Sequence, residues 1–393
     1  MELNYNSPHS TIKVLGREKY WAFTENNGCM LDTLMGNTAF VFGYNNKEIV
    51  SAMRDMQDKI PFLNWRSTEV CDENDQLVER ICERGHYDSV GWAVSGSDGV
   101  EAAVRINELY WQQVNPSKKK IVSFAPGYHG TTYLARLFRN KTSSEFAIVL
   151  DAPLWAHIVD RRFAEANTYS QLKQTLESNK DIGAVIFESL PWASGIMPWS
   201  DSWWHNVRNL CNKYNVNLIL DDVMGCCGKL GHYFSQDRVG PQADIVVLGK
   251  ALTGGFSPLS AVCVNSRITG VVKKIYDYGH TWQPNMAGVG AATAVLDIFD
   301  QFDFHSIEQQ LDALGKKIVS MDLANESVVQ GLAFELRLDN PIKASTYTKH
   351  GLVGSFNETE TFAGIDIFAP AIADDEYFYE LETRLISCLT DKQ

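Results

Sequence analysis

Seven short apolar runs between residues 90 and 264 constrain the fold more than any other feature of this sequence. Most of them are apolar at successive positions, which is typical of strands that helices cover on both faces of a mostly parallel sheet. Helical patterns lie between them, for example one that places Trp203, Val207, Leu210 and Tyr214 on one helix face. We therefore predict an α/β fold with a seven-stranded, mostly parallel sheet. Its predicted strands are 90–95, 120–124, 146–151, 183–188, 216–221, 244–249 and 259–264.

The composition of the chain indicates which partners and which cellular compartment to expect. The 45% hydrophobic and 21% charged residues are ordinary for a soluble globular protein, and a formal net charge of −13 argues against a nucleic acid as partner. No targeting segment and no apolar run of membrane-spanning length is present, so we expect a cytoplasmic protein that binds no membrane. The eight cysteines lack metal-like spacing. We expect them to be reduced core residues, and we expect no metal.

The ends of the predicted strands are where chemistry is expected. In an open α/β sheet, ligands bind beyond the carboxyl ends of the strands. These ends carry Ser95-Gly96-Ser97, Gly127-Tyr128-His129-Gly130, Glu188, Asp221 and Gly249-Lys250.

Lys250 and Asp221 each follow a buried run. Most lysines are solvated surface charges, but Lys250 comes directly after Ile-Val-Val-Leu-Gly. A lysine desolvated there has a lowered pKa and becomes a candidate Schiff-base nucleophile. Asp221 either caps the turn that follows its strand or keeps a pyridinium nitrogen protonated, and both interpretations remain open at this point.

The segment from residue 95 to residue 98 precedes a helical pattern. Asp98 and Glu101 stand at capping-box spacing, which predicts the start of the helix. The amides of this turn, the Ser97 hydroxyl and the helix dipole together favour a phosphate, although serine before a helix is often only a cap. Tyr128 is similarly open to two interpretations, as a packing residue or as a stacking platform.

Taken in order, these segments resemble class III (omega-type) aminotransferases of pyridoxal 5'-phosphate (PLP) fold type I, from about residue 15 to about residue 390. DIVVLGKALTGGFSPLSAV is similar to the family's lysine segment almost residue for residue. The other matching segments are LDTLMGNTAFVFGYNNKEI, AVSGSDGVEAAVRI, FAPGYHGTT, AVIFESLPWASGIMP, LILDDVMGCCGKLGHYF and HTWQPNMAGVGAATAVL.

The resemblance implies a role for each matching residue. It implies that Lys250 holds PLP as a Schiff base and that Asp221 pairs with the ring nitrogen, which makes these two residues catalytic. It also implies a homodimer, because one of the matching threonines reaches the phosphate of the partner subunit's cofactor. The implied cofactor-binding residues are Gly96, Ser97 at the phosphate, Tyr128 on one face of the ring, Val223 on the other face, Glu188 near Asp221, and Thr281 in the partner's site.

The chain departs from the family pattern in three places. Ser189 stands where proline is usual, Met224 where glutamine is frequent, and Lys229-Leu230 where Arg-Thr is common. We expect none of the three to contact Lys250 or Asp221, so they concern cofactor tuning and substrate choice.

The narrower resemblance is to diaminopelargonic acid (7,8-diaminononanoate) synthases, through the GYHG and LGKALTGG segments. Asn37-Thr38 replaces their Trp-Trp pair and Thr131 replaces an aspartate, which counts against that substrate.

The predicted activity is transamination from an amine or amino acid to a carbonyl acceptor by a ping-pong mechanism. Two alternatives are an aminomutase of the glutamate-1-semialdehyde type and a non-catalytic relative of the fold. The predicted organisation is a large PLP-binding domain over 56–294 and a small α+β domain formed by 1–55 and 295–393. The sequence identifies neither the amino donor nor the acceptor.

Overall fold

The structure is a computed structural model that describes residues 12–64, 69–139, 144–152, 161–196, 199–273, 279–359 and 362–391 of the chain. The chain divides into two compact units. One consists of Met1–Asn46 together with Asp303–Gln393, and the other of Lys47–Phe302.

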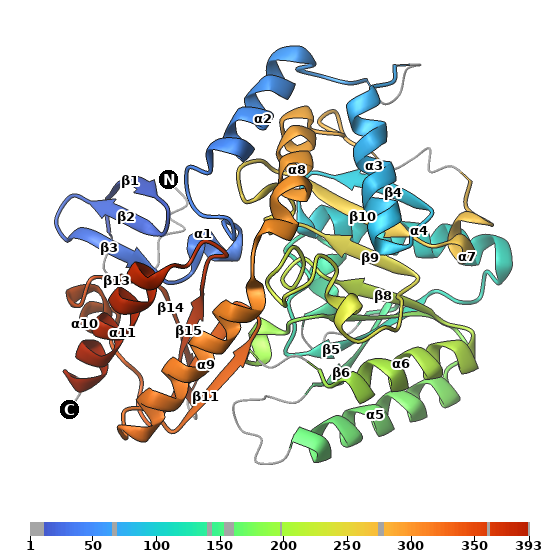
Figure 1. The fold of residues 1–393 in the computed structure, drawn as a ribbon. Helices are drawn as coiled ribbons and strands as arrows, with labels where there is room; N and C mark the ends of the chain where they lie inside the picture. The colour runs from blue at the N-terminus through green and yellow to red at the C-terminus, as the bar shows by residue number, and fades with distance from the viewer. Residues whose placement is uncertain are drawn as a thin grey trace, which may run out of the picture. The chain divides into compact units, whose positions relative to one another are not determined.

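The unit Lys47–Phe302 is built around a seven-stranded sheet in the order β4-β10-β9-β8-β7-β5-β6 (Figure 1). Strands β9, β8, β7, β5 and β6 are parallel to one another, and β10 is antiparallel to both β4 and β9. All seven predicted strands are therefore present, and the sheet is mostly parallel as predicted. Their bounds are β4 Ser89–Ala93, β5 Lys120–Ala125, β6 Ala147–Asp151, β7 Ile182–Glu188, β8 Asn217–Asp221, β9 Ile245–Leu248 and β10 Ser260–Val264.

Helices cover both faces of this sheet because its central strands are apolar at successive positions. On one face, Ile186, Ile219 and Val247 join the core formed with helix α4 (Gly96–Val114). On the other face, the ring of Phe187 packs at 5.1 Å from that of Trp204 in α6, since neighbouring residues of a strand point to opposite faces. The other helices of this unit are α2 Lys47–Lys59, α3 Asp72–Gly85, α5 Arg161–Ser178, α6 Asp201–Tyr214, α7 Ser266–Thr269 and α8 Met286–Ile298.

The second unit contains two smaller sheets, ordered β1-β2-β3-β13 and β11-β12-β15-β14. Its strands are β1 Val14–Glu18, β2 Trp21–Thr24, β3 Gly28–Asp32, β11 Glu326–Gln330, β12 Ala333–Leu338, β13 Leu352–Val353, β14 Ser355–Thr359 and β15 Phe362–Phe368. Its helices are α1 Met35–Thr38, α9 Phe304–Ser320, α10 Ala344–Lys349 and α11 Asp375–Thr390.

All eight cysteines are free thiols, and six of them are buried, as expected for reduced core residues. Within the described ranges, no helix combines the length and the apolar character needed to cross a membrane.

Candidate active site

Lys250 lies at the carboxyl edge of the sheet, two residues after β9. It begins a short 3₁₀ turn, Lys250–Thr253, with a φ of 47°. A positive φ is uncommon for a residue with a side chain and is typical of functional sites that the surrounding structure holds in place. The residue is half-buried, and burial, followed by the charge of Lys229, lowers the pKa of the Lys250 amine to about 8. About a tenth of this amine is therefore unprotonated at pH 7, far more than at the ordinary lysine pKa.

Asp221 is the last residue of β8 and forms a buried pair with His129. Its Oδ2 lies 2.8 Å from Nδ1 of His129, and its Oδ1 accepts the amide of Val223 at 3.2 Å. Burial lowers the pKa of His129, but the hydrogen bond and the negative charge of Asp221 outweigh that effect, so the pKa is raised. The raised pKa favours the imidazolium form of His129 beside the carboxyl group of Asp221.

Glu188 ends β7 directly beside Asp221, because these two residues are register partners of the parallel strands. Oε2 of Glu188 accepts the backbone amide of Tyr128 at 2.9 Å. Burial raises the pKa of Glu188 to about 7, while the positive charge of His129 opposes the shift. Tyr128 itself is 46% exposed, so its ring is open to a ligand.

The start of α4 lies against the segment that follows Tyr128. Ser97 Oγ accepts the amide of Thr131 at 3.2 Å. A Cβ added to Gly130, whose φ is 120°, would come within 2.5 Å of that same hydroxyl oxygen. A Cβ on Gly96 would meet Cγ1 of Val223 at 2.9 Å. The absence of a side chain at Gly130 lets the segment after Tyr128 approach Ser97, and its absence at Gly96 lets the start of α4 approach Val223.

The predicted capping box of α4 is wrong. Ser95 caps the helix by accepting the amide of Asp98 at 3.3 Å, and a carboxyl oxygen of Asp98 accepts the amide of Val94. Glu101 instead accepts the amide of Leu134 at 2.8 Å. The prediction failed because the helix begins at Gly96 with Ser95 as its N-cap, so Asp98 lies inside the first turn and not at the cap.

Thr281 makes no hydrogen bond or ion pair with the other predicted residues in the described part of the chain. It is exposed and makes no hydrogen bond within the part of the chain that the structure describes. Its neighbour His280 places Nε2 at 2.7 Å from Oδ1 of Asp98. The adjacent Trp282 is 65% exposed and packs edge-on against Phe62 at 6.2 Å.

The three departures from the family pattern lie closer to the site than expected. Nζ of Lys250 donates to Sδ of Met224 at 3.1 Å, and the amide of Ser189 donates to the carbonyl of Asp221 at 3.0 Å. Lys229 is fully buried and donates to the carbonyl of Val223 at 3.3 Å. The expectation that none of them contacts Lys250 or Asp221 is therefore wrong for Met224 and Ser189, because the segments after β7 and β8 turn back toward the strand ends.

Two buried acid–base residues of this region were not predicted as site residues from the sequence. One is His129, whose only signal was its place inside the GYHG segment. The other is Asp222, whose Oδ1 accepts the hydroxyl of Ser189 at 2.6 Å and whose Oδ2 accepts the amide of Ser235 at 2.9 Å. Burial raises the pKa of Asp222 to about 7, although the hydrogen bonds from both serines oppose it.

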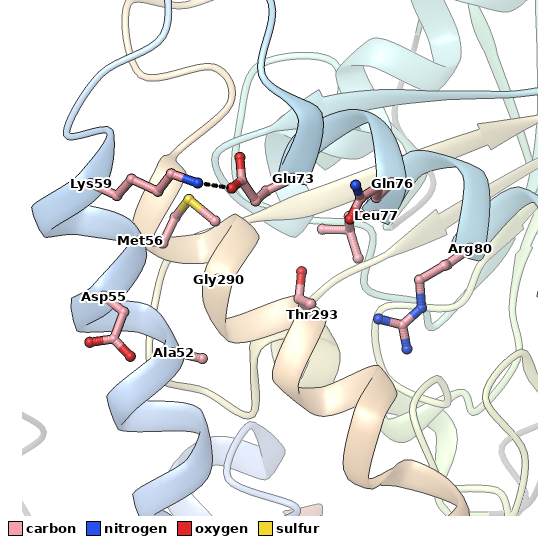
Figure 2. A pocket seen from close by; sticks show the side chains of 10 residues that line it. All are labelled: Ala52, Asp55, Met56, Lys59, Glu73, Gln76, Leu77, Arg80, Gly290 and Thr293. Carbon is pink, nitrogen blue, oxygen red and sulfur yellow. Dashed lines mark hydrogen bonds and ion pairs between the residues drawn. The ribbon is translucent and has the colours of Figure 1, made fainter.

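A separate pocket of about 200 Å³ lies among α2, α3 and α8 and contains none of the predicted site residues. In Figure 2, Lys59 of α2 faces Glu73 of α3 and forms an ion pair with it. The helices α2 and α8 pack closely here, because a Cβ on Gly290 would lie 2.4 Å from the carbonyl oxygen of Ala52. The pocket is lined by Ala52, Asp55, Met56, Lys59, Glu73, Gln76, Leu77, Arg80, Gly290 and Thr293.

Comparison with known proteins decides the family. Residues 6–330 match the family described as aminotransferase class-III. The chain belongs to the class-III aminotransferase family. It is 24% identical to ornithine aminotransferase 1 of Staphylococcus saprophyticus over 99% of this chain and 96% of that protein. It is 23% identical to a probable aminotransferase of Mycobacterium tuberculosis over 94% of this chain and 87% of that protein.

Solved transaminases share the fold. A PLP-bound amine transaminase from an uncultivated Pseudomonas species superimposes with a TM-score of 0.87 at 20% identity, covering 99% of this chain and 97% of that one. An omega-transaminase from Pseudomonas jessenii superimposes with a TM-score of 0.88 at 18% identity, covering 97% and 92% of the two chains.

Family and fold together confirm the predicted class. This class-III aminotransferase is an enzyme of PLP fold type I that catalyses PLP-dependent transamination of small-molecule substrates. Neither the aminomutase nor the non-catalytic alternative receives support from the comparisons. The narrower resemblance to diaminopelargonic acid synthases stays a prediction.

Proposed function

We propose that Lys250 and Asp221 are the catalytic residues of this transaminase. The observation that carries the proposal is the position of a desolvated amine, with a pKa of about 8, at the same sheet edge as a buried carboxylate paired with His129. Strands β9 and β8 are parallel neighbours, so Lys250 and Asp221 lie at the same edge of the sheet. An unprotonated amine is a nucleophile and a base, and a carboxylate beside the ring nitrogen favours its protonated form.

The residues present fit PLP. A dianionic phosphate suits the amides at the start of α4 and the hydroxyl of Ser97, with Gly96 leaving space for close approach. The exposed ring of Tyr128 and the side chain of Val223 are apolar surfaces for the two faces of a flat ring. We assign Glu188 to positioning, since it fixes the backbone of Tyr128.

When bound, PLP supplies an electron sink that acidifies the carbon bearing the substrate's amino group. Lys250 Nζ then removes the proton from that carbon, a role that its lowered pKa suits. Met224, whose sulfur accepts a hydrogen bond from Nζ, orients the amine without adding charge. The hydrogen bond between Asp221 and His129 keeps both side chains in place at the end of β8.

Reduction of the holoenzyme with borohydride, followed by peptide mapping, tests the assignment of Lys250. We expect the cofactor to be fixed on Lys250 and on no other lysine, and Lys250→Ala to bind PLP without covalent attachment. Lys229→Met is the matched control, because Lys229 is a second buried lysine near the site. Label on Lys229, or a parent enzyme that takes up no PLP, would refute the assignment.

We further propose that the active unit is a homodimer in which Thr281 serves the partner's cofactor. The exposed hydroxyl of Thr281 has no acceptor within the described residues of its own chain, and the adjacent pair of exposed rings, Trp282 and Phe62, offers apolar surface to a second copy. Exposed aromatic residues of this kind are enriched at protein interfaces. Sedimentation of the holoenzyme tests the oligomeric state.

The proposed organisation assigns cofactor binding to the large domain predicted over 56–294. All eight proposed site residues lie within the compact unit Lys47–Phe302, which supports this assignment.

We propose a cytoplasmic location, and an amine or amino-acid donor of the kind that relatives named ornithine aminotransferase and amine transaminase indicate. A panel of donors against pyruvate and 2-oxoglutarate tests the choice of substrate.

A further inference from the structure

Arg139 lies beside the ring of Tyr128, in a position that the sequence did not reveal. Its guanidinium carbon is 4.7 Å from the centre of the Tyr128 ring. The arginine follows a 3₁₀ turn, Ala135–Phe138, and its carbonyl oxygen accepts the amide of Gly127 at 3.2 Å. The backbone of Arg139 is therefore tied to the segment that carries Tyr128, although the two residues are eleven positions apart.

The turn that precedes Arg139 is held in place on two further sides. The ring of buried Phe138 packs edge-on against the imidazole of His129, with ring centres 6.3 Å apart. Glu101 of α4 accepts the amide of Leu134 at the start of the turn. These contacts fix the direction in which the chain reaches Arg139, so its place beside Tyr128 follows from the packing of the core.

The guanidinium of Arg139 has donors that the described part of the chain leaves unused. Its Nε is buried without a hydrogen-bond partner, and the arginine makes no ion pair with any described residue. The carboxyl groups of Asp221 and Glu188 have other partners, since Asp221 pairs with His129 and Glu188 accepts the amide of Tyr128. A buried, unpaired donor on a charged group is costly, and an acceptor on a ligand would remove that cost.

We propose that Arg139 is a specificity-determining residue that binds a substrate carboxylate beside Tyr128. The inference rests on the proposed function, in which Tyr128 borders the cofactor. Nε and one terminal nitrogen of a guanidinium can donate two parallel hydrogen bonds to a carboxylate, a geometry that an ammonium group cannot supply. The carboxylate belongs either to the amino donor or to a keto-acid acceptor, since both present the same chemistry to the guanidinium.

Binding of glutarate, a dicarboxylate that cannot react, tests the proposal independently of turnover. The PLP-loaded parent, Arg139→Gln, Arg139→Lys and Arg136→Gln are compared by calorimetry. Arg136 is the matched control because it lies on the same turn, is exposed, and stacks over a different ring, that of Tyr133, at 5.2 Å. We expect Arg139→Gln to weaken glutarate binding about tenfold to hundredfold, Arg139→Lys to lose less, and Arg136→Gln to stay within about twofold.

The two half-reactions, followed by the absorbance of the bound cofactor, identify the source of the carboxylate. We compare 4-aminobutyrate with butylamine as donors, and 2-oxoglutarate with butanal as acceptors. Arg139→Gln should lower kcat/KM at least about tenfold for the carboxylate-bearing member of one pair, with little change for the uncharged member. A loss confined to the donor pair assigns the carboxylate to the donor, and a loss confined to the acceptor pair assigns it to the acceptor.

Three results would overturn the proposal: equal losses for charged and uncharged substrates, equal effects of Arg139→Gln and Arg136→Gln, or a parent that neither binds glutarate nor prefers carboxylates. The first would show that Arg139 only supports the ring of Tyr128. A parent that reacts with no amine at all would refute the proposed function instead, and glutarate binding would still decide the role of Arg139.

Discussion

Replacing His129 with leucine tests whether the buried pair at the end of β8 is ionic. His129 Nδ1 lies 2.8 Å from Asp221 Oδ2, and both side chains are buried. Leucine fills most of the space beside Phe138 but leaves the carboxylate with only the amide of Val223 as a described hydrogen-bond donor. His129→Asn is the matched variant, because its side-chain amide restores a donor near the position of Nδ1.

We expect His129→Leu to lower the free energy of unfolding, because it removes one partner of a buried pair. Removing one partner of such a pair typically destabilises a protein by about 3 to 5 kcal/mol, because the other charge stays buried and uncompensated. A neutral amide that still donates to the carboxylate should recover roughly half of that loss, since hydrogen bonds to charged groups contribute about 1.5 to 3 kcal/mol. Urea unfolding of the PLP-free chains, followed by fluorescence and circular dichroism, measures the difference.

The pH dependence provides a sharper check. The pKa of His129 is raised above its ordinary value near 6.5, so the stabilisation is complete below that value and is lost as pH rises through the higher, folded-state pKa. The stabilising contributions of Glu188 and Asp222, whose pKa values are raised to about 7, also fall as pH rises. The Asp222 contribution is common to parent and variant. The Glu188 contribution depends on the charge of His129, so the comparison is made in a Glu188→Gln background. The free-energy difference between parent and His129→Leu should therefore shrink from pH 6 to pH 9. A difference below about 1 kcal/mol that does not vary with pH would refute an ionic pair.

Three further substitutions probe the proposed cofactor site. Asp221→Asn should retain PLP but lose roughly a hundredfold to a thousandfold in kcat, because an amide cannot hold the ring proton by charge; parent-like turnover would leave Asp221 as a structural cap. Gly130→Ala should destabilise the chain by about 1 to 3 kcal/mol and weaken PLP binding, since its Cβ would lie 2.5 Å from Oγ of Ser97, and equilibrium dialysis with unchanged PLP affinity would contradict this. Thr281→Ala should weaken PLP binding about tenfold to hundredfold. Mixing Thr281→Ala with Lys250→Ala chains should restore one parent-like site per hybrid dimer, whereas no restoration despite verified subunit exchange would place Thr281 in its own chain's site.

The seven strands could be predicted because their signal is local. A strand buried on both faces needs apolar side chains at successive positions. A few consecutive residues are therefore enough to predict it, as in the run 244–249. The location of Lys250 and Asp221 was predictable for a related reason, whereas their roles followed from the resemblance to the family. A charged residue directly after such a run must lie at the carboxyl edge of a parallel sheet, where ligands bind.

The contacts between strand ends depended on the tertiary structure. His129 and Asp221 are 92 residues apart in the sequence. They meet because only one strand, β7, separates β5 from β8 in the sheet, and no local pattern specifies this strand order. The same holds for Glu101, which bonds to Leu134 and not to the start of its own helix.

The position of Arg139 beside Tyr128 also could not be predicted from the local sequence. By sequence it is one arginine in a polar turn, and only the packing of Phe138 on His129 and the hydrogen bond to Gly127 bring it to Tyr128. Local sequence specifies which face of an element is buried, because burial acts on each residue separately. Which side chains meet at the edge of the sheet depends on strand order and on the path of the connecting turns, and the whole chain sets these together.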